Sequence, residues 1–294
     1  MTNDPAQLLE SWAAAPENTA RSVLVTIFGD TVLPVGESVW LAQLFKLTEL
    51  FGFSGRLVRT SLFRLAAEGW FTNERVGRQS RYVLTPLAIE ESEQAEQRIY
   101  HSPDPDWTGE WTVVFLEAPI IAEDTRTQLA QHLHWQGFIS LSRGIIASPN
   151  VTLDSARDLC DRVAPGVHVP LASLEFHELD SVVADGFFVQ ALAIDGLTKS
   201  YDEFTRFYET VDTDQLAHHP AVALGWRTML IHDLRRIKLS SPDIPVALLP
   251  ADWPGTAAHN LARDLYPVLS AAASPWLSEL LEVEYPRAFP NRFT

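Results

Sequence analysis

Apolar residues recur at helical spacing in three successive segments near the N-terminus, over 20–31, 39–50 and 55–68. The second segment follows Ser38 and the third follows Ser54. A serine in this position caps the free N–H groups of a helix. Residues that end or interrupt helices separate the segments: Pro34, Gly36, Gly52 and Gly69. The pattern therefore predicts three short helices, with Ser38 and Ser54 as the N-caps of the second and third.

The two faces of the third predicted helix differ in character. At about 100° per residue, one half of the helical wheel holds Leu57, Val58, Ser61, Leu62, Leu65 and Ala66. The other half holds Arg56, Arg59, Thr60, Phe63, Arg64 and Ala67. Arginine binds guanine edges and phosphates, and threonine can contact a base, a phosphate or a thymine methyl group. We therefore expect a helix that reads DNA, with an ordinary surface helix as the alternative.

A basic hairpin is predicted directly after this helix. Segments 70–75 and 81–85 are rich in aromatic and β-branched residues, and the intervening Val-Gly-Arg-Gln-Ser suits a turn. Three helices followed by a hairpin is the order of a winged helix-turn-helix domain, whose wing contacts the DNA backbone or minor groove. The predicted DNA-contacting residues are Ser54, Arg56, Arg59, Thr60, Phe63, Arg64, Arg78 and Arg81.

A further helix is predicted from Pro86 to Tyr100. Its acidic residues are expected on a solvated face, with a connecting or dimer-supporting helix as the alternative: Glu90, Glu91, Glu93 and Glu96. The segment His-Ser-Pro-Asp-Pro-Asp that follows has the composition of a linker. The first domain is therefore predicted over 20–100.

Between 107 and 178 the pattern changes to alternating strands and helices. An apolar strand precedes Pro119, a helix is expected over 123–136, and two short strands follow at 138–141 and 144–147. Asp154 is the expected N-cap of a helix to about Val163, and 167–176 is expected to be a strand. The order β-α-β-β-α-β predicts a ferredoxin-like domain with antiparallel pairing. This topology serves many functions, so it names none.

The central domain contains few candidates for catalysis or metal binding. His132 and His134 lie two residues apart, so on a helix they point to different faces. The alternative to a DNA-binding protein is a metal-dependent nuclease, for which Glu117 and Asp124 are the acids near the first strand. Neither has partners at ligand spacing, so the sequence predicts no metal, no cofactor and no enzyme activity.

The remainder, 179–294, is predicted to be a helical C-terminal domain. Helices are expected over 198–211, 221–238, 256–273 and 275–284. Aromatic and cationic residues gather in this part of the chain and form a candidate ligand site: Trp226, His232, Arg235, Arg236 and Trp253. Arg235 and Arg236 have the chemistry to hold a phosphate or carboxylate. The alternative is that the tryptophans are core and that the arginines pair with nearby acids.

The charge distribution supports the DNA-binding interpretation. The chain of 294 residues has a net charge of −16, which by itself disfavours nucleic acid. Between Arg56 and Arg81, however, six arginines and two glutamates give a local charge of +4, so the rest of the chain carries −20. The absence of a long apolar run and the single Cys160 predict a cytoplasmic protein without a membrane segment or disulfide, and Cys160 itself is expected to be buried.

Four segments resemble the PaaX family, bacterial repressors of phenylacetic acid degradation genes. They are Thr-Ile-Phe-Gly-Asp-Thr-Val-Leu-Pro at 26–34, the third-helix block at 55–70, the wing at 74–85, and 231–255, which contains His-Asp-Leu-Arg-Arg and Trp-Pro-Gly. The resemblance extends over about 21–269. It implies a winged helix, a central domain similar to the small CRISPR-associated endoribonuclease, and a helical C-terminal domain.

The resemblance also implies partners. A family member would form a homodimer on an inverted-repeat operator in double-stranded DNA, and phenylacetyl-CoA or a similar acyl-CoA would release it. The family's DNA contacts would fall on Arg56, Arg59, Thr60 and Arg64 of the helix, and on Arg78 and Arg81 of the wing. No ligand residue is implied, so the candidate ligand site remains an expectation from residue chemistry.

Overall fold

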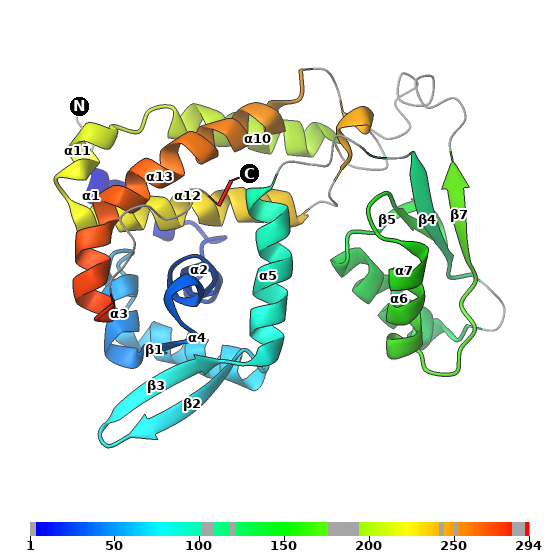
Figure 1. The fold of residues 1–294 in the computed structure, drawn as a ribbon, viewed down its shortest axis with the longest axis horizontal. Helices are drawn as coiled ribbons and strands as arrows, with labels where there is room; N and C mark the ends of the chain where they lie inside the picture. The colour runs from blue at the N-terminus through cyan, green and yellow to red at the C-terminus, as the bar shows by residue number, and fades with distance from the viewer. Residues whose placement is uncertain are drawn as a thin grey trace. The chain divides into compact units, whose positions relative to one another are not determined.

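The computed structural model describes residues 4–101, 107, 109–117, 121–175, 194–240, 244–249, 252–283 and 292–293. The chain forms two compact units. The first unit comprises Met1–His101, Phe204–Arg236 and Ala257–Thr294, and the second comprises Ser102–Glu203 and Ile237–Thr256. The structure mixes helices with two antiparallel sheets, which confirms the predicted α+β class (Figure 1). The division into domains over 20–100, 107–178 and 179–294 stays a prediction.

The N-terminal part of the first unit has the elements of a winged helix. Helix α2 (Ala20–Ile27) continues through a π-helical turn η1 (Phe28–Val32) and a short 3-10 turn η2 (Leu33–Val35). Strand β1 (Ser38–Trp40), α3 (Leu41–Glu49), α4 (Gly55–Ala67), β2 (Phe71–Val76), β3 (Gln79–Leu84) and α5 (Pro86–Tyr100) follow. The three strands form an antiparallel sheet in the order β1-β3-β2.

Ser38 is not the cap of the second helix of this domain, contrary to the sequence-based prediction. It begins strand β1, in which Ser38 pairs with Val83 and Trp40 with Arg81 of β3. The helix starts only at Leu41, and the side chain of Gln43 accepts a hydrogen bond from the Trp40 backbone N–H (2.9 Å). Strand pairing with β3 therefore takes the place of the helix cap that was predicted at Ser38. The local sequence pattern does not reveal this pairing, because its partner strand lies more than forty residues away.

Helix α4 forms as the sequence predicts. The Ser54 hydroxyl accepts a hydrogen bond from the Leu57 N–H (3.3 Å), so Ser54 is its N-cap. Gly69 stands two residues after the last helical residue at φ +85°, a conformation that glycine adopts without steric cost. Val58, Leu62 and Leu65 are fully buried and face α2, which packs against α4. The apolar half of the helical wheel therefore faces the core, except at Leu57, which lies in the first turn and is 45% exposed.

The second unit contains the ferredoxin-like fold that the strand and helix order predicts. Its elements are β4 (Glu110–Phe115), α6 (Glu123–Trp135), β5 (Ile139–Ser142), β6 (Ile145–Ser148), α7 (Leu153–Val163) and β7 (Leu171–Glu175). The sheet order is β5-β6-β4-β7, and each neighbouring pair is antiparallel. Thr152, not Asp154, caps α7, because the Thr152 hydroxyl accepts from the Ser155 N–H (3.2 Å). Cys160 is buried in the core between the helices and the sheet.

The C-terminal helices are α10 (Ile194–Tyr208), α11 (Thr213–Ala217), α12 (Pro220–Ser240), the 3-10 turn η3 (Val246–Leu248) and α13 (Pro254–Leu281). Helix α13 replaces two helices predicted over 256–273 and 275–284, with Pro267 and Pro275 inside it. Buried residues continue across both prolines at helical spacing: Tyr266, Leu269, Ala273 and Leu277. Their packing outweighs the local cost of the prolines. Among the described residues, no helix has the length and apolarity needed to cross a membrane.

Helix α1 (Pro5–Ala13), which the sequence did not predict, packs inside the first unit. Leu9 is 1% exposed, and a Cβ on Gly225 of α12 would lie 2.3 Å from its Cδ1. The Trp12 ring lies 5.7 Å from that of Phe51, in the turn before α4. Helix α1 therefore contacts both α12 and the turn that leads into α4.

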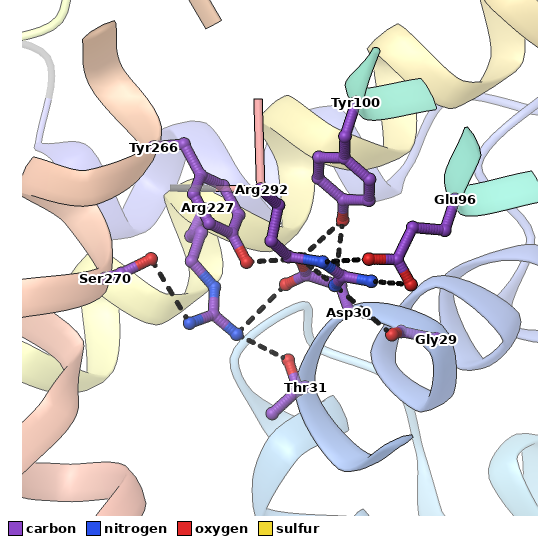
Figure 2. A network of polar contacts seen from close by, with 9 residues as sticks. All are labelled: Gly29, Asp30, Thr31, Glu96, Tyr100, Arg227, Tyr266, Ser270 and Arg292. Carbon is purple, nitrogen blue, oxygen red and sulfur yellow. Dashed lines mark hydrogen bonds and ion pairs between the residues drawn. The ribbon is translucent and has the colours of Figure 1, made fainter. Parts of the chain in front are cut away.

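A buried network of charged and polar side chains joins the winged helix to the C-terminal helices (Figure 2). At its centre is Asp30 of η1, whose Oδ1 accepts hydrogen bonds from the hydroxyls of Tyr100 (2.7 Å) and Tyr266 (2.9 Å). Its Oδ2 lies 3.0 Å from Nη2 of Arg227, and both side chains are almost completely buried. Burial and the charge of Asp30 raise the pKa of Tyr100, so that this hydroxyl stays a donor.

The same Arg227 also donates to Thr31 Oγ1 (2.9 Å) and Ser270 Oγ (3.4 Å). The network therefore includes η1, α5, α12 and α13 within the first unit. Buried charges are tolerated only when they are paired and hydrogen-bonded, so each element must keep its place for the others to be satisfied.

The substitution Asp30→Ala is expected to lower the free energy of unfolding by about 3–5 kcal/mol, because it leaves the buried Arg227 guanidinium without its counter-ion. Denaturant unfolding of the full chain measures this. The control is Asp264→Ala, which removes the exposed partner of Arg263 and should cost less than about 1 kcal/mol. Equal effects of the two substitutions would show that the network does not stabilise the fold.

Candidate nucleic-acid interface

The outer face of α4 carries the side chains that the helical wheel separated from the core. Arg56, Arg59, Thr60 and Arg64 are all exposed. Phe63, between them, is 75% exposed, the largest exposed fraction among the large apolar residues of the described chain. Because the opposite face of the helix is buried against α2, this row is held outward on a rigid support.

Arg59 is positioned by the preceding helix. Its guanidinium carbon lies 4.7 Å from the centre of the Phe45 ring of α3, a cation–π contact. Its positive charge also counteracts the burial that raises the pKa of Tyr82 on β3. The Thr60 hydroxyl donates to the Arg56 carbonyl one turn earlier (3.0 Å). The side chains of this face therefore have defined local contacts before any ligand binds.

The wing is a two-residue hairpin with Gly77 and Arg78 at its tip. Val76 pairs with Gln79, and Gly77 has φ +62°, the positive φ that the first central residue of such a turn requires. Strand β2 is exposed from Thr72 to Val76, so Arg75 and Arg78 both reach solvent. Arg75 lies in the basic segment but was not among the predicted contacts; its neighbours on β2 are exposed on both faces, so no periodic pattern marks it.

Arg81 differs from the other arginines of the interface. Its Nε donates to Ser38 Oγ (2.9 Å), and its guanidinium carbon lies 5.9 Å from the Trp40 ring centre. It thus fastens β3 to β1. A DNA contact by Arg81 stays a prediction, as do those of the other predicted residues.

A further ion pair fixes the C-terminal end of α4. Arg21 of α2 pairs with Glu68, the residue that follows the last helical residue of α4. Both side chains are 45% exposed, so the pair contributes little stability by itself. It neutralises an acidic charge at the end of the basic helix.

Comparison with known proteins matches three segments of the chain to domains of one family. Residues 19–87 match the model "PaaX-like protein", 104–181 match "PaaX protein central Cas2-like domain", and 193–279 match "PaaX-like protein C-terminal domain". The chain is 31% identical over 274 residues to the transcriptional repressor PaaX of Escherichia coli (strain K12), which covers 89% of this chain and 84% of that protein. The chain belongs to the PaaX family.

A solved structure shares the fold of this PaaX-family chain. It is the uncharacterized protein Rv0674 from Mycobacterium tuberculosis, with a TM-score of 0.54 and 19% sequence identity, covering 87% of this chain and 98% of that one. The relative from Escherichia coli is named a transcriptional repressor and not an enzyme, in agreement with the prediction of no enzyme activity. Of the acids considered for a nuclease, Glu117 forms an ion pair with Arg143 (2.9 Å).

The structure places the candidate ligand residues of the PaaX C-terminal helices in separate environments. Trp226 is 4% exposed, donates from Nε1 to the Pro5 carbonyl (3.2 Å), and stacks on Phe207. Trp253 belongs to the second unit, where its ring lies 5.4 Å from that of Tyr201. These tryptophans make packing contacts, and a role in ligand binding stays a prediction.

The polar candidates on α12 face α2 and the segment before it. His232 is fully buried, its Nδ1 lies 3.0 Å from Thr26 Oγ1, and burial together with the charges of Arg235 and Arg236 lowers its pKa to about 3. Arg236 donates to Asn18 Oδ1 (3.2 Å). Arg235 has no hydrogen bond or ion pair to any described residue, and its pKa is lowered by burial and by the charge of Arg21.

Asp233, between these residues, was not a predicted site residue. Its carboxylate accepts hydrogen bonds from Trp12 Nε1 (3.0 and 3.1 Å) and from the Tyr208 hydroxyl (2.8 Å). Burial raises the pKa of Asp233 to about 6, although the two donors and Arg236 lower it. No local pattern marks an aspartate in an otherwise buried helix segment, because its partners are far away in the sequence.

The raised pKa of Asp233 predicts a specific pH dependence. A carboxyl group whose pKa is about 6 in the folded chain and 3.8 unfolded stabilises the fold fully below about pH 4, and this contribution is lost as pH rises through 6. Relative to Asp233→Asn, the wild type should lose about 2.4 kcal/mol of unfolding free energy between pH 4 and 7. Denaturant unfolding at several pH values measures the difference. A difference between wild type and Asp233→Asn that is constant with pH would contradict it.

Proposed function

We propose that this PaaX-family chain is a DNA-binding transcriptional repressor that inserts α4 into the major groove. The observation that carries the proposal is the exposed arginine row of α4, on a helix whose other face is buried. The relative from Escherichia coli is named a transcriptional repressor, and the matched N-terminal model covers α4 and the wing. A repressor that acts on DNA would have to be in the cytoplasm, which is therefore part of the proposal.

The chemistry of the row suits both phosphates and base edges. Arg56, Arg59 and Arg64 can bind guanine O6 and N7 or backbone phosphates, and Thr60 can bind either. An apolar side chain as exposed as Phe63 has no partner in the described chain that would cover it, and a thymine methyl group in the major groove would do so. Arg75 and Arg78 of the wing would then contact the backbone or minor groove beside the helix.

We further propose a homodimer on an inverted-repeat operator, which the family resemblance supports. Two copies of α4 would then enter major grooves about 34 Å apart, or a multiple of that spacing. The acidic charge of the rest of the chain would oppose binding through other faces.

The double variant Arg59→Ala/Arg64→Ala is expected to bind the DNA upstream of its own gene at least 100-fold more weakly than wild type, since each arginine contact contributes about 1–3 kcal/mol. Its affinity should also depend less steeply on salt, because fewer counterions are released. Band-shift titration at several salt concentrations measures both quantities.

The matched control is Arg143→Ala/Arg263→Ala. Both arginines have exposed side chains and lie outside the winged helix. This control should bind like wild type. Unchanged binding by the α4 variant, with a normal melting temperature, would exclude α4 as the DNA-reading helix.

We also propose that an acyl-CoA, with phenylacetyl-CoA as the first candidate, lowers the affinity for DNA. The family resemblance supports the class of ligand. Arg235 supports its position, because a partly buried guanidinium without a counter-ion in the described chain favours an incoming phosphate or carboxylate. A ligand that releases DNA must bind the DNA-free conformation more tightly, and a 100-fold loss of occupancy requires about 2.7 kcal/mol of such preference.

Phenylacetyl-CoA at 100 times its dissociation constant is expected to stabilise the chain by about 2.7 kcal/mol. Denaturant unfolding with and without the thioester measures this. Arg235→Gln should abolish the gain, whereas Arg263→Gln should retain it. No stabilisation of the wild type by phenylacetyl-CoA would remove this effector and leave the DNA-binding proposal untouched.

A further inference from the structure

Arg292 and Phe293 dock side by side into the first unit, at the edge of the buried network around Asp30. Arg292 is 8% exposed by side chain, and Phe293 is 3% exposed. Their contacts come from three elements distant in the sequence: η1, α5 and α13. Figure 2 shows the Arg292 guanidinium between Glu96, Asp30 and Tyr100.

The contacts of Arg292 match the shape and charge of a guanidinium group. Its Nε donates to Glu96 Oε1 (3.1 Å), and its Nη2 lies 2.7 Å from Glu96 Oε2, which is the two-point geometry of an arginine–carboxylate pair. Its Nη1 lies 3.6 Å from Asp30 Oδ1 and 3.5 Å from the Gly29 carbonyl. The Tyr100 ring centre lies 4.2 Å from the guanidinium carbon, so a face of the cation is also covered.

The contacts of Phe293 form an aromatic cage. Its ring packs edge-on against Tyr100 (5.1 Å between centres), His259 (5.2 Å) and Tyr266 (5.7 Å). Edge-to-face arrangements of this kind are favourable beyond the area that they bury. Tyr100 and Tyr266 serve both halves of the site, because their hydroxyls donate to Asp30 while their rings hold Phe293.

The charge balance links this docking to the winged helix. Two carboxylates, Asp30 and Glu96, face two arginines, Arg227 and Arg292. Without Arg292, the network keeps one cation for two acids, and η1 loses one of its ties to α5. Helix α2 continues into η1 and packs against α4. A shift of η1 would therefore move the exposed face of α4, which is the proposed DNA-binding surface.

We propose that Gly29, Asp30, Glu96, Tyr100, His259 and Tyr266 form a recognition site for an adjacent arginine and aromatic residue, filled here by Arg292 and Phe293. Filling this site holds α5 and η1 against α13 in the arrangement that binds DNA. This second statement rests on the proposed function, whereas the recognition site itself does not.

The test uses the full chain with Arg292→Ala/Phe293→Ala and the peptide acetyl-Asn-Arg-Phe-amide as the probe. Millimolar peptide should raise the melting temperature of the variant and leave that of the wild type unchanged. The peptides Asn-Glu-Phe and Asn-Arg-Ala, capped in the same way, should have no effect. Absence of an Arg- and Phe-dependent shift in the variant would overturn the recognition site.

The same variant tests the link to DNA. Its operator affinity should fall about tenfold if vacating the site leaves about one tenth of the molecules in the competent arrangement, and the peptide should restore it. The control Arg263→Ala/Val268→Ala removes an exposed cation and an exposed apolar side chain from α13 and should bind like wild type. Unchanged operator binding by the variant would overturn the link.

Two further variants keep the test decisive if the double variant does not fold. Arg292→Lys retains the charge but loses the two-point contact with Glu96, and Phe293→Leu retains an apolar side chain but loses the edge-on contacts. Each single variant should bind the operator about threefold more weakly than wild type, which is half of the tenfold loss on a logarithmic scale. The peptide should raise the melting temperature of each variant. If the wild type itself binds no DNA, the proposed function fails, while the peptide experiment still decides on the recognition site.

Discussion

The ion pair between Asp30 and Arg227 is the interaction on which the rest of the first unit depends. Both groups are almost completely removed from water, so neither can be left unpaired without a cost of several kcal/mol. The two tyrosine hydroxyls that donate hydrogen bonds to the Asp30 carboxylate belong to α5 and α13, and Arg227 belongs to α12. One carboxylate on the π-helical turn that continues α2 thus contacts three helices that are far apart in the sequence: α5, α12 and α13.

The interior and the surface of the winged helix have different roles. The interior is fixed by buried charged and aromatic groups that pair with one another within the chain, and α2 packs against α4 through apolar side chains. The surface of α4 and the wing carries arginines of which only some are engaged, namely Arg59 with Phe45 and Arg81 with Ser38. A helix held on one face and charged on the other meets the geometric requirement for reading a groove without first reorganising.

Patterns that depend on near neighbours could be predicted from the sequence. The Ser54 cap, the two faces of α4, the hairpin and the ferredoxin-like order follow from periodicity and turn chemistry within about thirty residues of each other. Features that depend on distant partners could not. Ser38 joins a strand because Val83 is beside it, α13 runs through two prolines because its buried stripe continues, and Arg227 is a core residue because Asp30 meets it. Asp233 and Arg292 have no local signal for the same reason.

Methylation interference on the DNA upstream of the gene tests the central claim, that α4 reads the major groove, most directly. Guanine N7 lies in the major groove, and adenine N3 lies in the minor groove. The account predicts that methyl groups on N7 of operator guanines block binding of the full chain, in two clusters about one helical turn, or a multiple of it, apart. Binding that is blocked only by methylation of adenine N3, or by neither modification, would contradict it.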